Sequence, residues 1–178
     1  MSMKQPHRPR GCLGQVGIGV VLCLGFLLPG AVRAQETGAI VVSMGGGMTL
    51  YSIDTRFDDG TVLRGSVGYS PLPYLMVEGG GRWHRCFDCD RFLVGEAGVQ
   101  LRYPGPRWSP FVSVGGGRSS DPGFMGPEWG LHAAVGSWLW LSEEWGLQLE
   151  ARGRQVGHSN YMGEFSLGGA RRFLGAER

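Results

Sequence analysis

The sequence predicts an all-β fold, an eight-stranded antiparallel up-and-down transmembrane β-barrel that follows an N-terminal signal peptide. Three observations predict it. The chain opens with a basic segment, an apolar segment and small residues, in the order of a secretory signal. Beyond that signal, no apolar run approaches the roughly 20 residues of a membrane helix. Instead, eight short segments of mixed polar and apolar residues follow one another between turn-forming residues.

The predicted signal peptide covers residues 1–34. Basic residues near the start precede an apolar stretch over residues 11–28, and small residues lead up to Ala34. An uncleaved anchor helix is the alternative, but glycine and proline interrupt the apolar stretch, which favours cleavage. Cleavage after Ala34 leaves one domain, residues 35–178, and predicts export from the bacterial cytoplasm.

The charge of the mature chain excludes nucleic acid as a partner. The whole chain has 17 basic and 15 acidic residues. Its basic excess comes from the predicted signal peptide, which contains Lys4, Arg8, Arg10 and Arg33. Nucleic-acid binding needs a basic patch, whereas the mature chain has more acidic than basic residues.

The eight predicted strands have the length that a tilted membrane-crossing strand needs, around 9–11 residues. They cover residues 38–51, 61–70, 74–84, 91–103, 109–118, 128–141, 145–156 and 161–173. Short connections at 70–73, 104–107 and 142–144 alternate with mostly longer, more polar ones. This alternation is typical of outer-membrane barrels, whose short turns face the periplasm.

Most segments separate an apolar from a polar face, because successive side chains of a strand point to opposite sides. The first segment contains the glycine triplet 45–47. The second to fourth and the last two alternate clearly; their apolar faces carry Leu63, Val67, Tyr69, Leu75, Val77, Trp83, Leu93, Val99, Leu101, Leu147, Leu149, Phe165 and Leu167. The fifth has no clear face. In the sixth, Trp138 and Trp140 oppose Leu139, so both faces are largely apolar.

The opposite faces carry arginine and glutamate in neighbouring strands, as an interior ion-pair network requires. If these faces were turned outward, Arg152 and Arg154 would lie in lipid, at roughly 2–4 kcal/mol each near the midplane. We therefore predict apolar faces toward lipid and a plugged, ion-paired interior. The predicted interior residues are Arg64, Glu78, Arg82, Glu96, Glu150, Arg152, Arg154, Glu164 and Arg172.

Glycines in the strands are interpreted as sites of close backbone approach or bends, and those on the charged faces also as space for long arginine side chains. They include Gly80, Gly98, Gly136 and Gly168. The glycine triplets do not open helices and lack the lysine of a phosphate-binding loop. We expect no cofactor and no bound metal.

Four stretches, residues 68–78, 109–117, 147–154 and 165–173, resemble strands of the OmpA-like eight-stranded outer-membrane barrels. The resemblance covers nearly the whole mature chain. It implies a place in the bacterial outer membrane, in contact with outer-membrane lipid and lipopolysaccharide. It also implies periplasmic chaperones and the barrel-assembly machinery as partners during biogenesis, and a structural or surface-interaction role.

The one cysteine pair of the mature chain is Cys86 and Cys89. An exported protein meets an oxidising compartment, which favours a disulfide between them. Free thiols remain an alternative. A metal site with His84 is a further one, although a single C-x-x-C pair is weak support for zinc.

Two rival functions stay open. His158 and Ser159 are similar to the histidine and serine of outer-membrane lipid A deacylases, with Glu164 as a candidate to orient the histidine. A polar turn is the plainer interpretation of these residues. The other rival is a soluble periplasmic barrel that binds an apolar ligand and turns its apolar faces inward.

Overall fold

The computed structural model describes residues 37–51, 60–86, 91–120, 127–156 and 160–173. These residues form eight strands close to the predicted bounds: β1 (Ala39–Tyr51), β2 (Gly60–Leu72), β3 (Leu75–Cys86), β4 (Phe92–Arg102), β5 (Trp108–Ser119), β6 (Trp129–Trp140), β7 (Trp145–Val156) and β8 (Asn160–Phe173). This part of the chain has no helix long and apolar enough to cross a membrane. The predicted signal peptide, residues 1–34, lies outside the described residues.

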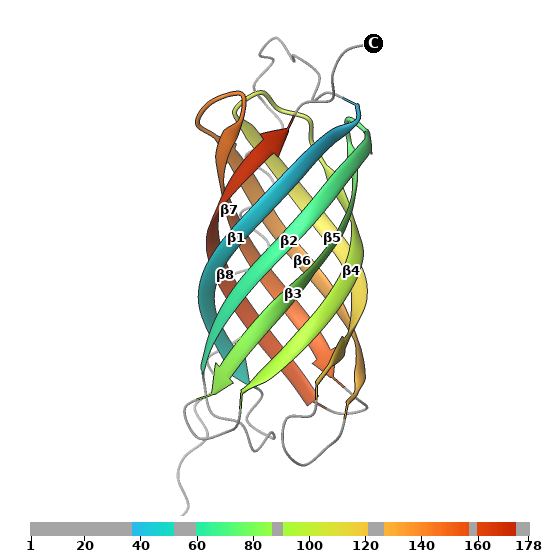
Figure 1. The fold of residues 1–178 in the computed structure, drawn as a ribbon, viewed down its shortest axis with the longest axis vertical. Coiled ribbons are helices and arrows are strands. Elements are labelled where there is room, and N and C mark those ends of the chain that lie inside the picture. The colour runs from blue at the N-terminus through green and yellow to red at the C-terminus, as the bar shows by residue number, and fades with distance from the viewer. Residues whose placement is uncertain (1–36, 52–59, 87–90, 121–126, 157–159, 174–178) are drawn as a thin grey trace, which may run out of the picture. The chain divides into compact units, whose positions relative to one another are not determined.

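The strands form a closed barrel in chain order (Figure 1). Every strand is antiparallel to its neighbours, and β1 pairs with both β2 and β8. A path of paired residues that leaves β1 at Val41 passes once around the barrel and returns to β1 at Tyr51. This stagger tilts the strands against the barrel axis, as closure of a sheet requires. The predicted eight-stranded antiparallel barrel is confirmed.

The two ends of the barrel differ. The connections from β2 to β3, from β4 to β5 and from β6 to β7 all lie at the end where β1 starts and β8 finishes. We call this the short-turn end. Backbone hydrogen bonds tighten it, among them Arg172 N to Glu144 O at 2.7 Å and Gly38 N to Ser70 O at 2.7 Å. The opposite end, which we call the long-loop end, carries the connections at 52–59, 87–91, 120–128 and 157–159.

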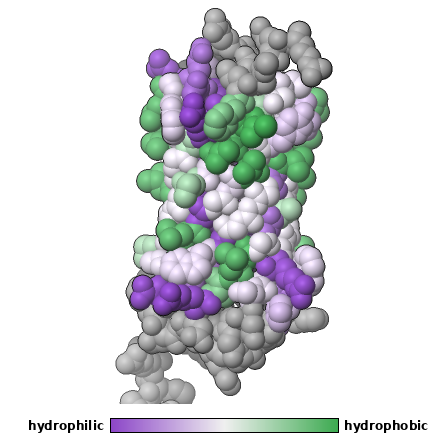
Figure 2. Space-filling model, in the orientation of Figure 1, coloured by the Kyte–Doolittle hydropathy of each residue, from purple (hydrophilic) through white to green (hydrophobic). Residues whose placement is uncertain are grey.

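The apolar faces point outward. Leu63, Val67 and Leu149 are among many large apolar side chains that are more than half exposed. Figure 2 shows apolar residues across the middle of one face of the barrel, with hydrophilic residues gathered mainly toward its ends. The two strands that the sequence left unassigned follow the same rule: Val114 of β5 and Leu131 of β6 face outward. A cylinder with this surface is suited to a lipid environment.

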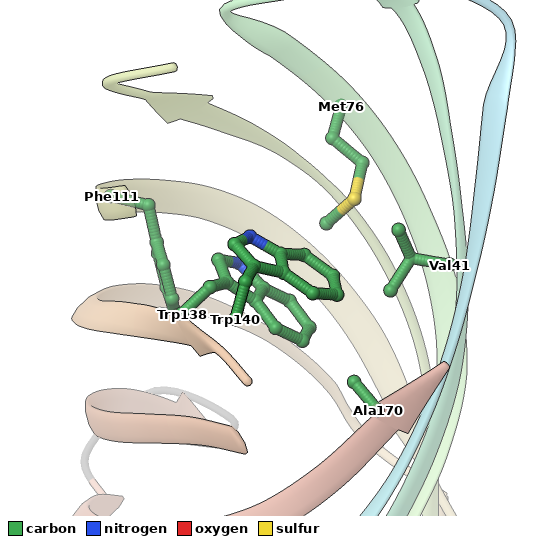
Figure 3. Packing of buried hydrophobic residues seen from close by; sticks show 6 residues of the cluster. All are labelled: Val41, Met76, Phe111, Trp138, Trp140 and Ala170. Carbon is green, nitrogen blue, oxygen red and sulfur yellow. The ribbon is translucent and has the colours of Figure 1, made fainter. Parts of the chain in front are cut away.

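Buried apolar side chains form a cluster within the barrel (Figure 3). It consists of Val41, Met76, Phe111, Trp138, Trp140 and Ala170, and we call it the aromatic cluster after its three stacked or adjoining rings. The rings of Trp138 and Trp140 stack with centroids 5.7 Å apart, and Phe111 lies against Trp138. Both tryptophans therefore point inward, on the same face of β6 as His132. The aromatic cluster fills the lumen toward the short-turn end, where β6 finishes.

Interior glycines show close backbone approach, the first of their two predicted roles. A Cβ atom on Gly45 would lie 2.5 Å from the carbonyl oxygen of Leu167, and a Cβ on Gly168 would lie 2.5 Å from that of Met44. A Cβ on Gly80 would meet the backbone of β2 in the same way. The obstacle is thus the neighbouring strand and not an arginine side chain. These glycines permit close backbone approach where the sheet curls tightly.

We therefore expect Gly45→Ala to lower the free energy of unfolding by about 1–3 kcal/mol, because the backbone must shift to make room. Gly169→Ala is the matched control: Gly169 lies on β8, and a Cβ there would meet nothing within 4 Å. The control should change stability by less than about 1 kcal/mol. Urea unfolding of both variants in lipid vesicles measures the difference, and equal stability would contradict the close-approach explanation.

Candidate functional site: a charged interior within an apolar cylinder

Arg82 is the centre of the interior. Its side chain comes from β3 and is 2% exposed. It donates to Glu96 of β4 at 2.8 Å, to Glu150 of β7 at 2.6 Å and to Glu164 of β8 at 2.7 Å. One guanidinium thus joins one wall of the barrel to the opposite wall. Arginine is suited to this position because it presents five donors in a rigid plane.

Two arginines of β7 extend these contacts. Arg152 lies 2.8 Å from Glu96 and 2.9 Å from Glu150. Arg154 pairs with Glu96 as well, and its Nε lies 3.3 Å from Glu164. Each of these three carboxylates therefore has at least two cationic neighbours once Arg82 is included. Hydrogen bonds of this charge-assisted kind are the strong ones in proteins.

The remaining predicted interior charges lie at the edges of this group. Arg64 donates to Gln148 at 2.8 Å and lies 3.9 Å from Glu150. The side chain of Glu78 is nine-tenths buried, and its nearest charged contact is Arg152 at 3.7 Å. Together the interior ion-pair network comprises Arg64, Glu78, Arg82, Glu96, Glu150, Arg152, Arg154 and Glu164. Its acidic and basic side chains are equal in number, so the described network carries no net charge.

Arg172, the ninth predicted interior residue, lies at the short-turn end. Its guanidinium lies 4.2 Å from the ring centre of Trp140, and its Nε donates to the carbonyl oxygen of Glu143 at 2.9 Å. The side chain is half-buried. Arg172 thus covers the aromatic cluster at the mouth of the barrel.

The outward-facing Arg171 is also accommodated at this end. It pairs with Glu144 at 3.0 Å, and its guanidinium lies within about 5 Å of the ring centres of Trp145 and Phe173. Aromatic residues concentrate at such a level, where one side of the ring meets lipid and the other meets water. Arg171 therefore lies in an interfacial girdle and not in the apolar band.

Solved structures of outer-membrane β-barrels and a designed transmembrane β-barrel share this architecture. Neisserial surface protein A is 15% identical, and the match covers 77% of this chain and 98% of that one, with a TM-score of 0.63. The N-terminal β-barrel domain of Pseudomonas aeruginosa OprF is 14% identical over 78% of this chain and all of its own, with a TM-score of 0.61. A de novo designed transmembrane β-barrel is 19% identical, and the match covers 79% of this chain and 99% of the designed one, with a TM-score of 0.61.

The chain has the fold of small outer-membrane β-barrels. It shares the architecture of these proteins but few of their residues. No protein-family model matches the chain, and no curated protein matches it. What this barrel does must therefore be argued from its own side chains.

Several interior residues were not among the predicted set. Arg102 is buried and donates to Ser70 Oγ at 2.5 Å and to the carbonyl oxygen of Pro73 at 3.2 Å. The indole Nε1 of Trp138 donates to Gln100 Oε1 at 2.9 Å. Strict alternation along β4 places Gln100 and Arg102 on the charged face, so the signal was present in the sequence. The inward side of β6 had no such signal, because both of its faces are apolar.

A small pocket opens beside the network. It is lined by Ser66, Glu78, Glu96 and His132 together with glycines and Ala97, and it has space for on the order of one water molecule. Neither ring nitrogen of His132 has a hydrogen-bond partner, while its Nδ1 lies 3.9 Å from Glu96. No group of three His, Cys, Asp or Glu residues in the described ranges could hold a metal ion.

The other predicted sites fall largely beyond the described part of the chain. His158, Ser159 and Cys89 lie outside the described residues, as does the side chain of Cys86. The disulfide therefore stays a prediction. Glu164 is described: its side chain is buried in the lumen and bound by Arg82 and Arg154.

Proposed function

We propose that this protein is a small, non-conducting barrel of the OmpA-like group in a bacterial outer membrane, with a structural or surface-interaction role. In this proposal a cleaved signal peptide exports it, and periplasmic chaperones and the barrel-assembly machinery insert it. Outer-membrane lipid and lipopolysaccharide surround it. The observation that carries the proposal is the combination of a charged, filled lumen with an apolar outer surface.

The lumen supports a closed barrel. At eight strands the interior is just wide enough for side chains to fill. Here the interior ion-pair network crosses the middle of the lumen, and the aromatic cluster fills it toward the short-turn end. A hydrated ion would have to break contacts of Arg82 with Glu150 and Glu164 to pass. This supports a role for the outer surface and loops instead of transport through the centre.

The direction of the faces argues against a soluble ligand-binding barrel. Such a protein would turn its apolar faces inward around a cavity. In this barrel Leu149 and Phe165 are more than half exposed, whereas Glu150 and Glu164 are almost completely buried. A soluble monomer rarely exposes apolar patches of such extent.

The geometry gives no support to deacylation of lipid A. A catalytic carboxylate would have to orient a histidine on the lipid side. Glu164, the candidate for this role, points into the lumen and is held by two arginines. No described contact favours the hydrolase, so we do not propose it.

Two measurements test the proposal. Cell fractionation should recover the full chain from the outer membrane, and folded protein should migrate faster in SDS gels before boiling than after it. In planar bilayers the purified barrel should give no large, stable openings. Recovery from the periplasm without detergent would contradict the membrane location, and sustained conductance would contradict the closed interior.

A further inference from the structure

Three exposed arginines lie on the outward face at the long-loop end. Arg85 lies near the end of β3, Arg91 immediately precedes β4, and Arg118 lies near the end of β5. Each occupies the outward-facing register of its strand; Trp83, Leu93 and Val114 share that register. We call these three residues the arginine patch.

The sheet register sets two of the three opposite each other and places the third on the next strand, four residues along β4 from Arg91. Because β3 and β4 pair His84 with Phe92, the next step along both strands brings Arg85 opposite Arg91. On the adjacent strand β5, Arg118 pairs with Gly95 of β4. The backbone of Ser120 donates to Leu93 at 2.7 Å and ties the end of β5 to the start of β4. The arginine patch therefore spans three adjacent strands.

The positive charge of this patch has no counterpart in the described part of the chain. None of the three guanidinium groups forms an ion pair there. The contrast with the other arginines is clear: Arg82 has three carboxylate partners, and the outward-facing Arg171 has Glu144. Like charges directly opposite each other on paired strands are unfavourable. An anion between Arg85 and Arg91 would remove that repulsion.

The position of the patch indicates what kind of anion this is. Apolar side chains lie beside it, including Leu93, Val114 and Leu131, and the exposed Trp129 pairs with Arg118. A ligand that lies along this wall therefore has an apolar part against these outward apolar side chains and a negatively charged part beside the arginines. The planar guanidinium binds phosphate through two parallel hydrogen bonds.

We propose that the arginine patch binds the phosphate groups of a phosphorylated glycolipid, the lipid A part of lipopolysaccharide, in the outer leaflet. This inference rests on the outer-membrane location proposed above. Acyl chains lie against the outward side chains of β3 to β5, and a phosphate group lies between Arg85 and Arg91. Arg118 contacts the same headgroup from β5.

A charge-matched pair of variants tests the patch. Arg85→Gln with Arg91→Gln removes two patch charges, whereas Arg107→Gln with Arg171→Gln removes two exposed charges at the short-turn end. The full-length mature protein is refolded in detergent micelles, and lipid A binding is measured by native mass spectrometry. Because each arginine near an anionic lipid surface strengthens the attraction, the patch variant should bind at least about tenfold more weakly. The short-turn variant should bind as the unchanged protein does.

Two further probes identify the ligand chemistry. Dephosphorylated lipid A should bind the unchanged protein about as weakly as intact lipid A binds the patch variant. Phosphatidylglycerol should bind more weakly than intact lipid A. Equal binding of dephosphorylated lipid A would overturn the phosphate contact, and equal binding of phosphatidylglycerol would overturn the choice of a glycolipid. An unchanged affinity of the patch variant would overturn the site itself.

The failure of this inference is distinguishable from failure of the proposed function. Both variants change only exposed side chains and should keep the heat-dependent gel shift of a folded barrel. If the chain fractionates with the outer membrane and lipid A binding is independent of Arg85 and Arg91, only the patch assignment is wrong. If the chain is recovered without detergent, the membrane location itself is wrong.

Discussion

Arg82→Met is expected to lower the free energy of unfolding by about 3–5 kcal/mol, the usual result of breaking a buried ion pair from one side. The change removes the only cation that contacts Glu96, Glu150 and Glu164 together in the described interior. Three carboxylates, all at least nine-tenths buried, would then share the two arginines of β7 and, at 3.9 Å from Glu150, Arg64. Urea unfolding in lipid vesicles measures the loss.

A second substitution separates charge from packing. Adding Glu164→Gln to Arg82→Met restores equal numbers of acidic and basic side chains in the network, so part of the lost stability should return. Coupling of this kind is expected between residues in direct contact, and Arg82 lies 2.7 Å from Glu164. A loss that remained undiminished in the double variant would show that the volume of the side chain matters more than its charge.

Arg171→Met provides the exposed reference. Arg171 and Glu144 form a pair of similar length, but each is about half exposed. Exposed pairs contribute about 0–1 kcal/mol, so this variant should unfold close to the unchanged protein. Equal effects at Arg82 and Arg171 would contradict a buried, cross-lumen network.

Leu149→Arg is the second substitution with a large expected effect. Leu149 lies near the middle of β7, is 63% exposed and faces the apolar band. An arginine at the bilayer midplane costs roughly 2–4 kcal/mol in barrels of this type. In a soluble barrel the same exposed position would tolerate arginine. Unfolding in vesicles, with the fraction folded confirmed by gel mobility, measures the cost.

The same substitution at a different depth is the control. Leu141 is 67% exposed but follows β6 at the short-turn end. Close to the membrane interface an arginine costs only about 0–1 kcal/mol, so Leu141→Arg should be nearly neutral. Equal losses at Leu141 and Leu149 would mean that depth has no influence, and the outer surface would then not face lipid.

The alternation of polar and apolar residues along the strands was sufficient to predict much of the fold. In β7, Leu147 and Leu149 alternate with Gln148 and Glu150, and the structure exposes the first pair while it buries the second. The reason is local: successive side chains of any strand point to opposite sides. Short turns between the segments then required antiparallel neighbours, and β1 could meet β8 only by closing the sheet.

The alternation of polar and apolar residues could not predict the inward face of a strand whose two faces are both apolar. Trp138 and Leu139 are both apolar, yet Trp138 is 1% exposed and Leu139 is nearly half exposed. The inward face of β6 is set by contacts with other strands: Gln100 accepts a hydrogen bond from Trp138, and Phe111 packs against the ring of Trp138. The sequence suggested close backbone approach at the interior glycines but not the atoms approached, since these belong to another strand.

By itself the sequence determined the number of strands, their order and the direction of most faces, because a period of two residues and turn chemistry act over short stretches of chain. Only the tertiary structure decided which carboxylate meets which guanidinium. Arg82 and Glu150 are 68 residues apart in the chain and touch across the lumen only after β1 has closed against β8. The arginine patch also depends on the sheet register, which sets Arg85 opposite Arg91 and places Arg118 on the adjacent strand.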